Sequence, residues 1–287
     1  MRIADIYKWD KPVLSLEVFP PKPGYSLKTV FDTLDGLRGL RPAFVSVTYA
    51  SLGESEGRTV EIASRVRDDY GCESLAHMTC IGHSKSEVAS LLDKLEQSGI
   101  RNILALRGDI PGGCETRKCD YRFASELIAE ISARETLCVG AAAYPEGHIE
   151  SRRISTDLDN LKRKVDAGAE FLITQLFFDN RIFYDFMERA RSRNIEIPVI
   201  PGIMPILNYR QIKRILMMCA VSIPAKLLNL FDKYSHDPDE LARAGVDYAV
   251  EQVSQLVDEG VQGIHLYTMN RVMQIREIVQ RSGLREH

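Results

Sequence analysis

The sequence lacks the motifs that identify many nucleotide-binding and metal-binding enzymes. It contains no GxGxxG and no GxxxxGK(S/T), so neither a Rossmann nor a P-loop nucleotide site is supported. No His-x-His ends the first apolar run, which argues against a metal-dependent amidohydrolase. No lysine lies within an apolar run, which weakens the case for a Schiff-base aldolase. We expect no metal site.

Charge imbalance and long apolar stretches are also missing. The 287 residues carry a formal net charge of −3, which gives no indication of binding to nucleic acid or to an anionic membrane. No apolar stretch approaches the roughly 18 residues that span a bilayer, and the opening MRIADIYKWDKP has no apolar signal-peptide core. The six cysteines form no CxxC pair, which favours reduced thiols. We expect a cytoplasmic protein without a membrane or nucleic-acid partner.

Two cysteines leave an alternative open. Cys114 and Cys119 share the long Gly-rich segment 108–121, where they could pair or hold a metal ion. No histidine lies nearby to complete a ligand set, so reduced thiols remain the favoured interpretation. Long loops in compact domains are often functional, and this one has no other assignment.

What the sequence does contain is eight short apolar runs that alternate with helical patterns, which favours a parallel sheet. The runs are LSLEVF (14–19), FVSVTY (44–49), SLAHMTC (74–80), NILALRGD (102–109), VGAAAYPEGH (139–148), FLITQLFF (171–178), PVIPGIMP (198–205) and GIHLYTMNR (263–271). The length slightly exceeds the roughly 250 residues typical of a (β/α)8 barrel. We predict an α/β fold of the (β/α)8 TIM-barrel type, with one catalytic domain over residues 1–287.

The segments between the runs carry helix start and stop signals. Capping-box pairs are expected at Ser84 with Glu87 and at Thr156 with Asp159. Glycines 99 and 168 stand where those two helices should stop. Residues 221–238 insert an extra segment before the eighth run. Further helices are predicted at about 27–39, 57–70, 122–134, 181–193, 208–220, 239–259 and 270–281.

Chemically capable residues end seven of the eight runs, and only PVIPGIMP ends without one. They are Glu17, Thr48, His77, Arg107 with Asp109, Tyr144 with His148, Gln175, and Arg271. A (β/α)8 barrel places its active site at the carboxyl ends of its strands, so this pattern predicts an enzyme. Glu17 lies among apolar neighbours, where burial disfavours its charged form and suits a general acid. The alternative for Glu17 is a carboxylate that faces solvent.

The other candidates also have structural alternatives. Thr48, His77 and Gln175 could each be a satisfied core residue, and a structural role is preferred for His265. The LALRGDIP segment could hold an anion or close the barrel rim with an Arg–Asp ion pair. The helix after YPEGH presents a polar stripe that is either a solvated face or a ligand contact. The stripe consists of Asp157, Asn160 and Lys164, with Arg163 beside it.

With these residues in view, the chain resembles the MetF-type methylenetetrahydrofolate reductases, which are flavoproteins. The matching segments run in order from residue 14 to 271: LSLEVFPPK, FVSVTYA, AHMTCIG, NILALRGDIP, AAYPEGH, DLDNLKRKVDAGAEFLITQLFFDN, IPVIPGIMP and HLYTMNR. The resemblance implies a (β/α)8 barrel that binds FAD without a Rossmann motif. It implies a ping-pong reaction in which NAD(P)H reduces FAD and methylenetetrahydrofolate then receives the hydride, a step of one-carbon metabolism and methionine biosynthesis.

The resemblance also implies residue roles. Glu17 would be the general acid that opens the folate's five-membered ring, and Asp109 and Gln175 would act at the flavin and the pterin. Thr48, Gln175, Gln211 and Arg271 would contact substrates. The expected FAD contacts are Tyr49, Ser51, His77, Arg107, Gly108, Asp109, Ala124, Tyr144, His148, Asp157, Asn160, Arg163 and Lys164.

Departures from the family pattern leave some points open. Ser51, Phe123 and Ile215 replace residues that members often or sometimes have there, and Ile215 leaves the choice between NADH and NADPH undecided. The regulatory domain of eukaryotic members, which binds S-adenosylmethionine, is not expected. We expect a homo-oligomer, with a protein electron donor as a further partner to consider. The alternatives are a non-catalytic or partner-dependent folate-binding barrel subunit, or a different TIM-barrel lyase.

Overall fold

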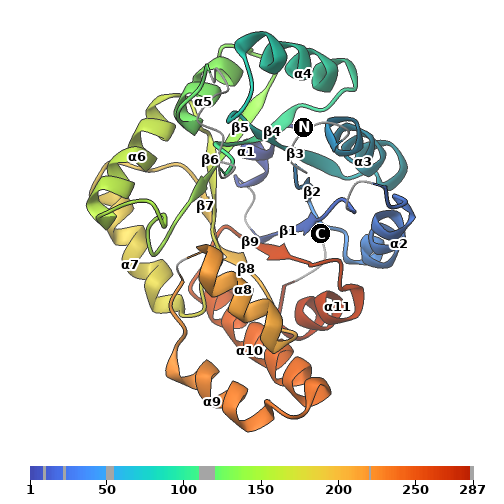
Figure 1. Cartoon of the computed structure of the whole chain (residues 1–287), viewed down its shortest axis with the longest axis vertical. Helices are drawn as coiled ribbons and strands as arrows, with labels where there is room; N and C mark the ends of the chain where they lie inside the picture. Colours follow the sequence, from blue (N-terminus) through green and yellow to red (C-terminus); the bar gives the residue numbers. More distant parts are fainter. Residues whose placement is uncertain (9–10, 22–23, 50–54, 110–119, 220, 285–287) are drawn as a thin grey trace.

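The eight apolar runs form one ring of parallel strands, with helices around it (Figure 1). The computed structural model describes residues 1–8, 11–21, 24–49, 55–109, 120–219 and 221–284. The strands are β1 (Val13–Val18), β2 (Phe44–Val47), β3 (Glu73–Thr79), β4 (Asn102–Leu106), β5 (Cys138–Ala143), β6 (Phe171–Thr174), β7 (Val199–Ile200), β8 (Gly202–Ile203) and β9 (Gly263–Tyr267). The predicted (β/α)8 barrel is confirmed.

The helices follow the predicted alternation. They are α1 (Ile3–Ile6), α2 (Lys28–Leu37) with the 3-10 turn η1 (Arg38–Leu40), α3 (Ser55–Tyr70), α4 (Lys85–Gln97), α5 (Ala124–Ser132), α6 (Ile154–Asp166), α7 (Asn180–Arg191), α8 (Tyr209–Cys219), α9 (Ala225–Tyr234), α10 (Pro238–Asp258) and α11 (Val272–Arg281). The inserted segment 221–238 contains α9, which lies beside α10 at the outer edge of the molecule (Figure 1). None of the described helices is long and apolar enough to cross a membrane.

The seventh run closes the ring in two pieces. Pro201 has no N–H to give to a strand ladder, and it separates β7 from β8. β7 pairs with β6, and β8 pairs with β9, so one interrupted segment joins the last strands to the first. The buried hydroxyl of Thr174 on β6 accepts a 2.9 Å hydrogen bond from the backbone N–H of Gly202. The run without a reactive end therefore closes the barrel.

We expect the Thr174→Val variant to lose about 1–3 kcal/mol of unfolding free energy. Valine keeps the shape of threonine but leaves the buried Gly202 N–H without its partner. Urea unfolding followed by circular dichroism measures the loss. The control is Thr29→Val at the surface of α2, which should change stability by less than about 0.5 kcal/mol. Equal stability of the two variants would contradict this account of barrel closure.

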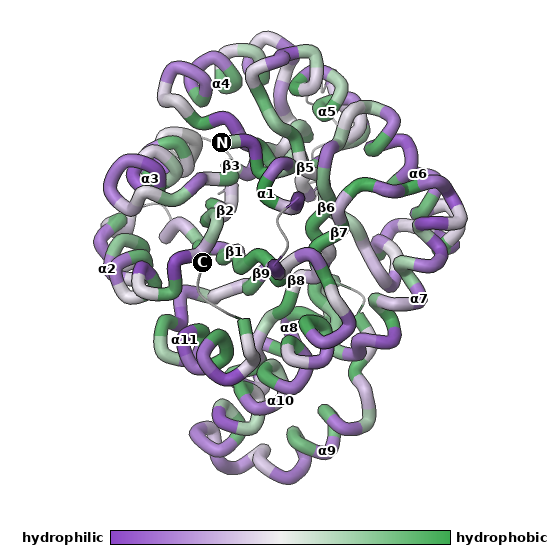
Figure 2. Tube along the Cα trace, turned by 180° about the vertical axis from the view of Figure 1, so that it is seen from behind, coloured by the Kyte–Doolittle hydropathy of each residue, from purple (hydrophilic) through white to green (hydrophobic). Residues whose placement is uncertain are grey.

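The core has an outer layer between strands and helices and an inner layer inside the ring. Figure 2 shows the helices alternating between hydrophobic and hydrophilic residues along the chain, with α1 at the opening of the ring. Ile3 and Ile6 of α1 pack with Phe44 and Phe171 inside the ring, and the Ile3 N–H donates to Asn102 Oδ1 at 2.8 Å. Helix α1 thus fills the amino-terminal end of the barrel.

One of the two expected capping boxes is present and the other is wrong. Ser84 and Glu87 exchange both capping hydrogen bonds at the start of α4. Helix α6 instead begins at Ile154, with Arg153 as an N-cap that makes no side-chain bond. Ser151, which precedes the helix, donates a 3.0 Å hydrogen bond to the buried Asp157 in the first turn, so a contact from the preceding segment stabilises this earlier start.

Candidate functional site

A buried carboxylate stands inside the carboxyl end of the barrel. Glu17 is next to last in β1 and is only 5% exposed. Side chains alternate along a strand, so Ser15 and Glu17 point the same way. The register places Ser46 of β2 opposite Glu17, and His265 of β9 opposite Ser15. Three strands thus direct polar side chains to one point inside the ring.

The carboxylate of Glu17 is shared among three neighbours. Its Oε2 lies 3.4 Å from His265 Nε2, 3.5 Å from His77 Nε2 and 3.5 Å from the Ser46 hydroxyl. Ser46 Oγ also lies 2.5 Å from His77 Nε2, and Ser15 Oγ lies 2.9 Å from His265 Nδ1. Burial lowers the pKa of His77, so its ring is neutral at neutral pH. A proton can therefore reside on this cluster next to Glu17 while the His77 ring stays uncharged.

Sequence reasoning did not find Ser15 or Ser46, and it assigned His265 to the core. His265 is fully buried and stacks on Phe44, which agrees with a structural role, but its ring also contacts the Glu17 carboxylate. The signal in the sequence was the i, i+2 spacing of Ser15 and Glu17. Their partners on β2 and β9 could be known only from the register of the ring.

A second group of side chains lines a cavity of about 250 Å³ between the ends of β4 and β5 and helices α5 and α6. Seven of its lining residues were expected as cofactor contacts from the resemblance, and an eighth, Ala124, stands at the start of α5. The seven are Arg107, Tyr144, His148, Asp157, Asn160, Arg163 and Lys164. The polar stripe of α6 therefore faces a cavity rather than open solvent.

Lys164 is the cation most strongly affected by its surroundings in this cavity. Burial lowers the pKa of Lys164 to about 8. Its Nζ donates a 2.8 Å hydrogen bond to the Ala142 carbonyl and lies 5.4 Å from the centre of the Tyr144 ring. Neither contact supplies a full negative charge. The charge of nearby Asp157 offsets the effect of burial only in part, and an anionic group in the cavity would stabilise the Lys164 ammonium further.

Arg107 is held by a partner that the sequence did not reveal. Its two terminal nitrogens donate to the two carboxylate oxygens of Glu150 at 2.6 and 2.7 Å. This contact lowers the pKa of Glu150. The rim ion pair considered for Arg107 therefore forms with Glu150, whereas Asp109 is exposed and has no ion pair with a described residue.

The remaining expected residues lie around the mouth of the barrel. Gln175, after β6, accepts a 3.0 Å bond from the Leu176 N–H. Thr48, after β2, donates a 2.9 Å bond to the Val18 carbonyl. Gln211 lies near the start of α8 and contacts Met204 Sδ at 3.8 Å. Arg271 is exposed before α11.

Two more expected residues have well-defined surroundings, and others lie outside the described part. Tyr49 has its hydroxyl 3.4 Å from His83 Nε2. Gly108 has a φ of +85°, and a Cβ there would come within 3.1 Å of Thr79. Ser51, Cys114 and Cys119 lie outside the described residues. Within the described ranges, no group of three His, Cys, Asp or Glu side chains could hold a metal ion.

The family model and the curated relatives of this chain indicate the same family. A family model described as "Methylenetetrahydrofolate reductase" matches residues 2–283. The 5,10-methylenetetrahydrofolate reductase of Escherichia coli (strain K12) is 37% identical over 272 residues, which cover 95% of this chain and 91% of that protein. A probable methylenetetrahydrofolate reductase (NADPH) of Caenorhabditis elegans is 35% identical over 99% of this chain, and the match covers 44% of the worm protein.

Solved structures show the same fold at low sequence identity. One is an uncharacterized protein from Clostridium thermocellum that binds two copies of 5-methyl-5,6,7,8-tetrahydrofolic acid. It is 14% identical to this chain, with a TM-score of 0.62 and coverage of 97% of this chain and 96% of that chain. A likeness at this level of identity supports the barrel alone.

Proposed function

This chain belongs to the methylenetetrahydrofolate reductase family, and we propose that it reduces 5,10-methylenetetrahydrofolate to 5-methyltetrahydrofolate with NAD(P)H and FAD. The observation that carries the proposal is that the buried Glu17 cluster and a cation-lined cavity both lie at the carboxyl end of the barrel. An acid and a separate anion site are what a folate reduction with a dinucleotide cofactor needs. The proposal treats the chain as one catalytic barrel domain.

The cavity beside β4 and β5 has the donor set expected for FAD. Arg107, Arg163 and Lys164 are cations, and Lys164 forms no ion pair with a described residue, which fits a diphosphate. Asn160 and the ring of Tyr144 add a hydrogen-bonding group and an aromatic face. When bound, FAD would supply the hydride carrier that amino-acid side chains cannot supply.

Glu17 would act as the general acid. Its carboxyl group stands inside the barrel at the carboxyl end of β1, where a substrate that enters the mouth would meet it. We propose that it gives a proton to a ring nitrogen of the folate, so that the five-membered ring opens to an iminium that accepts hydride. Ser46 and the neutral His77 lie in contact with this carboxylate and would help to return the proton.

Gln175 and Asp109 would orient the two substrates in turn. The Oε1 of Gln175 is taken by Leu176, so its amide nitrogen remains available to donate to a pterin or a nicotinamide. Asp109 is exposed and follows the end of β4. Burial raises the pKa of Tyr144 to about 12, and the nearby charge of Asp109 adds to this effect. Thr48, Gln211 and Arg271 would complete the substrate contacts around the mouth.

The direct test follows a bound flavin through both halves of the reaction. The purified chain should take up FAD, lose flavin absorbance when NADH or NADPH is added without oxygen, and regain it with methylenetetrahydrofolate. Separate additions of the two coenzymes decide the preference. A chain that binds no FAD would favour a different barrel enzyme. A chain that binds folate but does not bleach with either coenzyme would favour a binding subunit or one that needs a partner electron donor.

Other features belong to the proposal as well. We expect a cytoplasmic homo-oligomer that acts in one-carbon metabolism and methionine biosynthesis. Gel filtration with light scattering measures the oligomeric state.

We expect the Glu150→Gln variant to bind FAD about threefold to tenfold more tightly. The Glu150 carboxylate occupies both terminal nitrogens of Arg107, and the neutral amide would release this guanidinium for an anionic ligand at a gain of about 1 kcal/mol. Fluorescence titration of the apoprotein with FAD measures the affinity. The control is Glu135→Gln, an exposed carboxylate outside the cavity. An unchanged affinity would mean that Glu150 and FAD do not compete.

We expect FAD binding to take up close to one proton at pH 9. In the free protein, the buried Lys164 has a pKa of about 8 and is mostly neutral at pH 9. A nearby diphosphate raises that pKa, so the amine regains its proton on binding, whereas at pH 6 it is already charged and takes up none. Calorimetry in buffers of different ionisation enthalpy counts the protons. Uptake that persists in Lys164→Met would contradict this assignment.

A further inference from the structure

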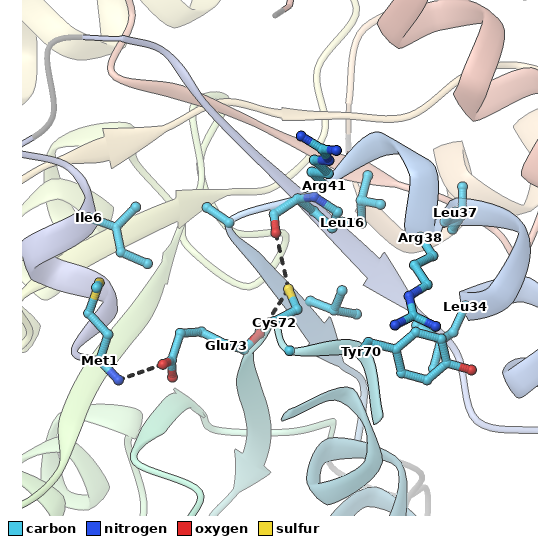
Figure 3. Close-up of a pocket in the computed structure, with 14 residues that line it drawn as sticks. Met1, Ile6, Leu16, Leu34, Leu37, Arg38, Arg41, Tyr70, Cys72 and Glu73 are labelled. Carbon is cyan, nitrogen blue, oxygen red and sulfur yellow. Dashed lines mark hydrogen bonds and ion pairs between the residues drawn. The ribbon is translucent and has the colours of Figure 1, made fainter. Parts of the chain in front are cut away.

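The two ends of the barrel differ in what they offer a ligand. A cavity of about 570 Å³ lies at the amino-terminal end, where Figure 3 shows Met1 and Glu73 on one side, Arg38 on the other and Cys72 between them. The leucines that line it are at most 3% exposed, and the guanidinium groups of Arg38 and Arg41 point apart (Figure 3). Such a cavity presents little apolar surface and no paired cations, so the features that bear on function lie at the carboxyl end.

At the carboxyl end, Glu146 makes a long-range contact that none of the proposed roles uses. It lies in the turn after β5, between Tyr144 and His148 of the cofactor cavity. Both oxygens of its carboxylate accept the backbone N–H of Ser222, at 3.1 and 2.9 Å, and these are its only hydrogen bonds among the described residues. Ser222 lies 76 residues further along the chain, between α8 and α9. The contact therefore ties the wall of the proposed FAD cavity to the segment that follows α8.

The turn that carries Glu146 is held by its own contacts. The Gly147 N–H donates to the Tyr144 carbonyl at 3.0 Å, and the Ser151 N–H donates to the His148 carbonyl at 2.8 Å. The rings of Tyr144 and His148 pack edge to face, with their centres 4.8 Å apart. A hydrogen bond to a carboxylate is also stronger than one between neutral groups. Glu146 is therefore a fixed acceptor that can hold a less stable element in place.

Helix α8 is such an element, because it has few buried contacts. Among its residues Tyr209–Cys219, Ile212 is the one that is buried, whereas Met217 is 74% exposed. Elements with few buried apolar contacts open more readily than the core of a protein. A single hydrogen bond just beyond the end of α8 can therefore have a measurable effect on its position.

The two ends of α8 lie near different strands of the ring. Near its start, Gln211 Nε2 lies 3.8 Å from Met204 Sδ, just after β8. At its end, burial raises the pKa of the Cys219 thiol, and the nearby charge of Asp109, after β4, adds to this effect. Helix α8 therefore extends from the β8 side of the barrel mouth towards the side of β4 and β5. Its position determines where Gln211 lies at the mouth.

We propose that Glu146 is a positioning residue, which holds α8 at the barrel mouth so that Gln211 is in place for the folate. This role depends on the proposed function, which assigns Gln211 to the folate. Without the bond from Ser222 to Glu146, α8 occupies its binding position in a smaller fraction of molecules. The apparent affinity for the folate falls with that fraction. Glu146 takes no part in the proposed proton or hydride transfer, so the rate at saturating folate should change little.

Hydrogen–deuterium exchange of the full chain tests whether Glu146 holds α8. In Glu146→Ala, the backbone amides of Ser222 and of the end of α8 should exchange about tenfold faster than in the native chain, because the acceptor of the Ser222 N–H is gone. Glu146→Gln keeps an acceptor oxygen and should restore most of the protection. The control is Glu188→Ala, which removes an exposed carboxylate from α7 and should leave this exchange unchanged. Equal exchange in Glu146→Ala and the native chain would overturn the proposal.

Flavin reoxidation at increasing concentrations of methylenetetrahydrofolate tests the consequence for the substrate. Glu146→Ala should raise the half-saturating folate concentration about tenfold, whereas the limiting rate and the dissociation constant of FAD should change less than about twofold. Glu146→Gln should lie between this variant and the native chain, and Glu188→Ala should match the native chain. An unchanged half-saturating concentration, or a loss confined to the limiting rate, would overturn the positioning role. If folate failed to reoxidise the flavin of the native chain, the proposed function would be wrong, and the exchange comparison would still decide whether Glu146 holds α8.

Discussion

Replacing Glu17 with glutamine should leave flavin reduction by NAD(P)H nearly unchanged and slow the reaction with methylenetetrahydrofolate by about 10²–10⁴-fold. This range is the usual contribution of one general acid. Glutamine keeps the size of the side chain and can still contact His77, His265 and Ser46. It has no acidic proton to give to the folate. Only the half-reaction that needs ring opening should therefore suffer.

Rapid-mixing absorbance of the flavin under anaerobic conditions measures the two half-reactions separately. The control is Glu251→Gln on α10, an exposed carboxylate that pairs with Lys226 outside the site. It should preserve both rates. If Glu17→Gln kept both half-reactions, Glu17 would not be the acid. If both were lost while FAD binding also failed, the variant would have disturbed the site as a whole.

The second large effect is expected at Lys164, where methionine should weaken FAD binding about 10- to 100-fold. Methionine fills similar space but removes the charge that would meet the diphosphate, and a hydrogen bond to a charged group contributes about 1.5–3 kcal/mol. The loss should appear in the dissociation constant and not in the fold, because the contacts of the Lys164 ammonium are one neutral backbone carbonyl, of Ala142, and the Tyr144 ring. Titration of apoprotein with FAD at pH 7 measures it.

The matched control lies on the same helix. Lys162→Met removes a cation that pairs with Asp166 away from the cavity, and it should change FAD affinity by less than twofold. Equal weakening by the two variants would indicate a general effect of net charge and would contradict a specific contact. Unchanged binding in both would place the cofactor phosphate at Arg107 or Arg163 instead.

Local patterns predicted much of the fold. The alternation of apolar runs with helices predicted the barrel, and Ser84 with Glu87 predicted the start of α4, because both signals depend on residues close in sequence. The predicted start of α6 was wrong because Ser151, which precedes the helix, donates a hydrogen bond to Asp157 within the helix. Helix α9 within the inserted segment was also not predicted.

The candidate site was likewise predictable only in part. Residues at run ends were identified as one set, and three of them, Arg107, Tyr144 and His148, line a single cavity together with the polar stripe of α6. Their partners were not predictable from the pattern. Glu150 lies in a loop with no periodicity, yet it holds Arg107, which is 43 residues away.

By itself, the sequence determined the ring of strands and the chemical groups at its carboxyl end. Strand periodicity and the position of a residue in a run are local properties, and a barrel turns them into a common face. Only the tertiary structure decided which groups meet. Glu17 and His265 are 248 residues apart, and their contact depends on the register of β1 with β9. The lowered pKa of Lys164 likewise depends on burial by several elements, since the free energy of an ionised group is set by everything packed around it.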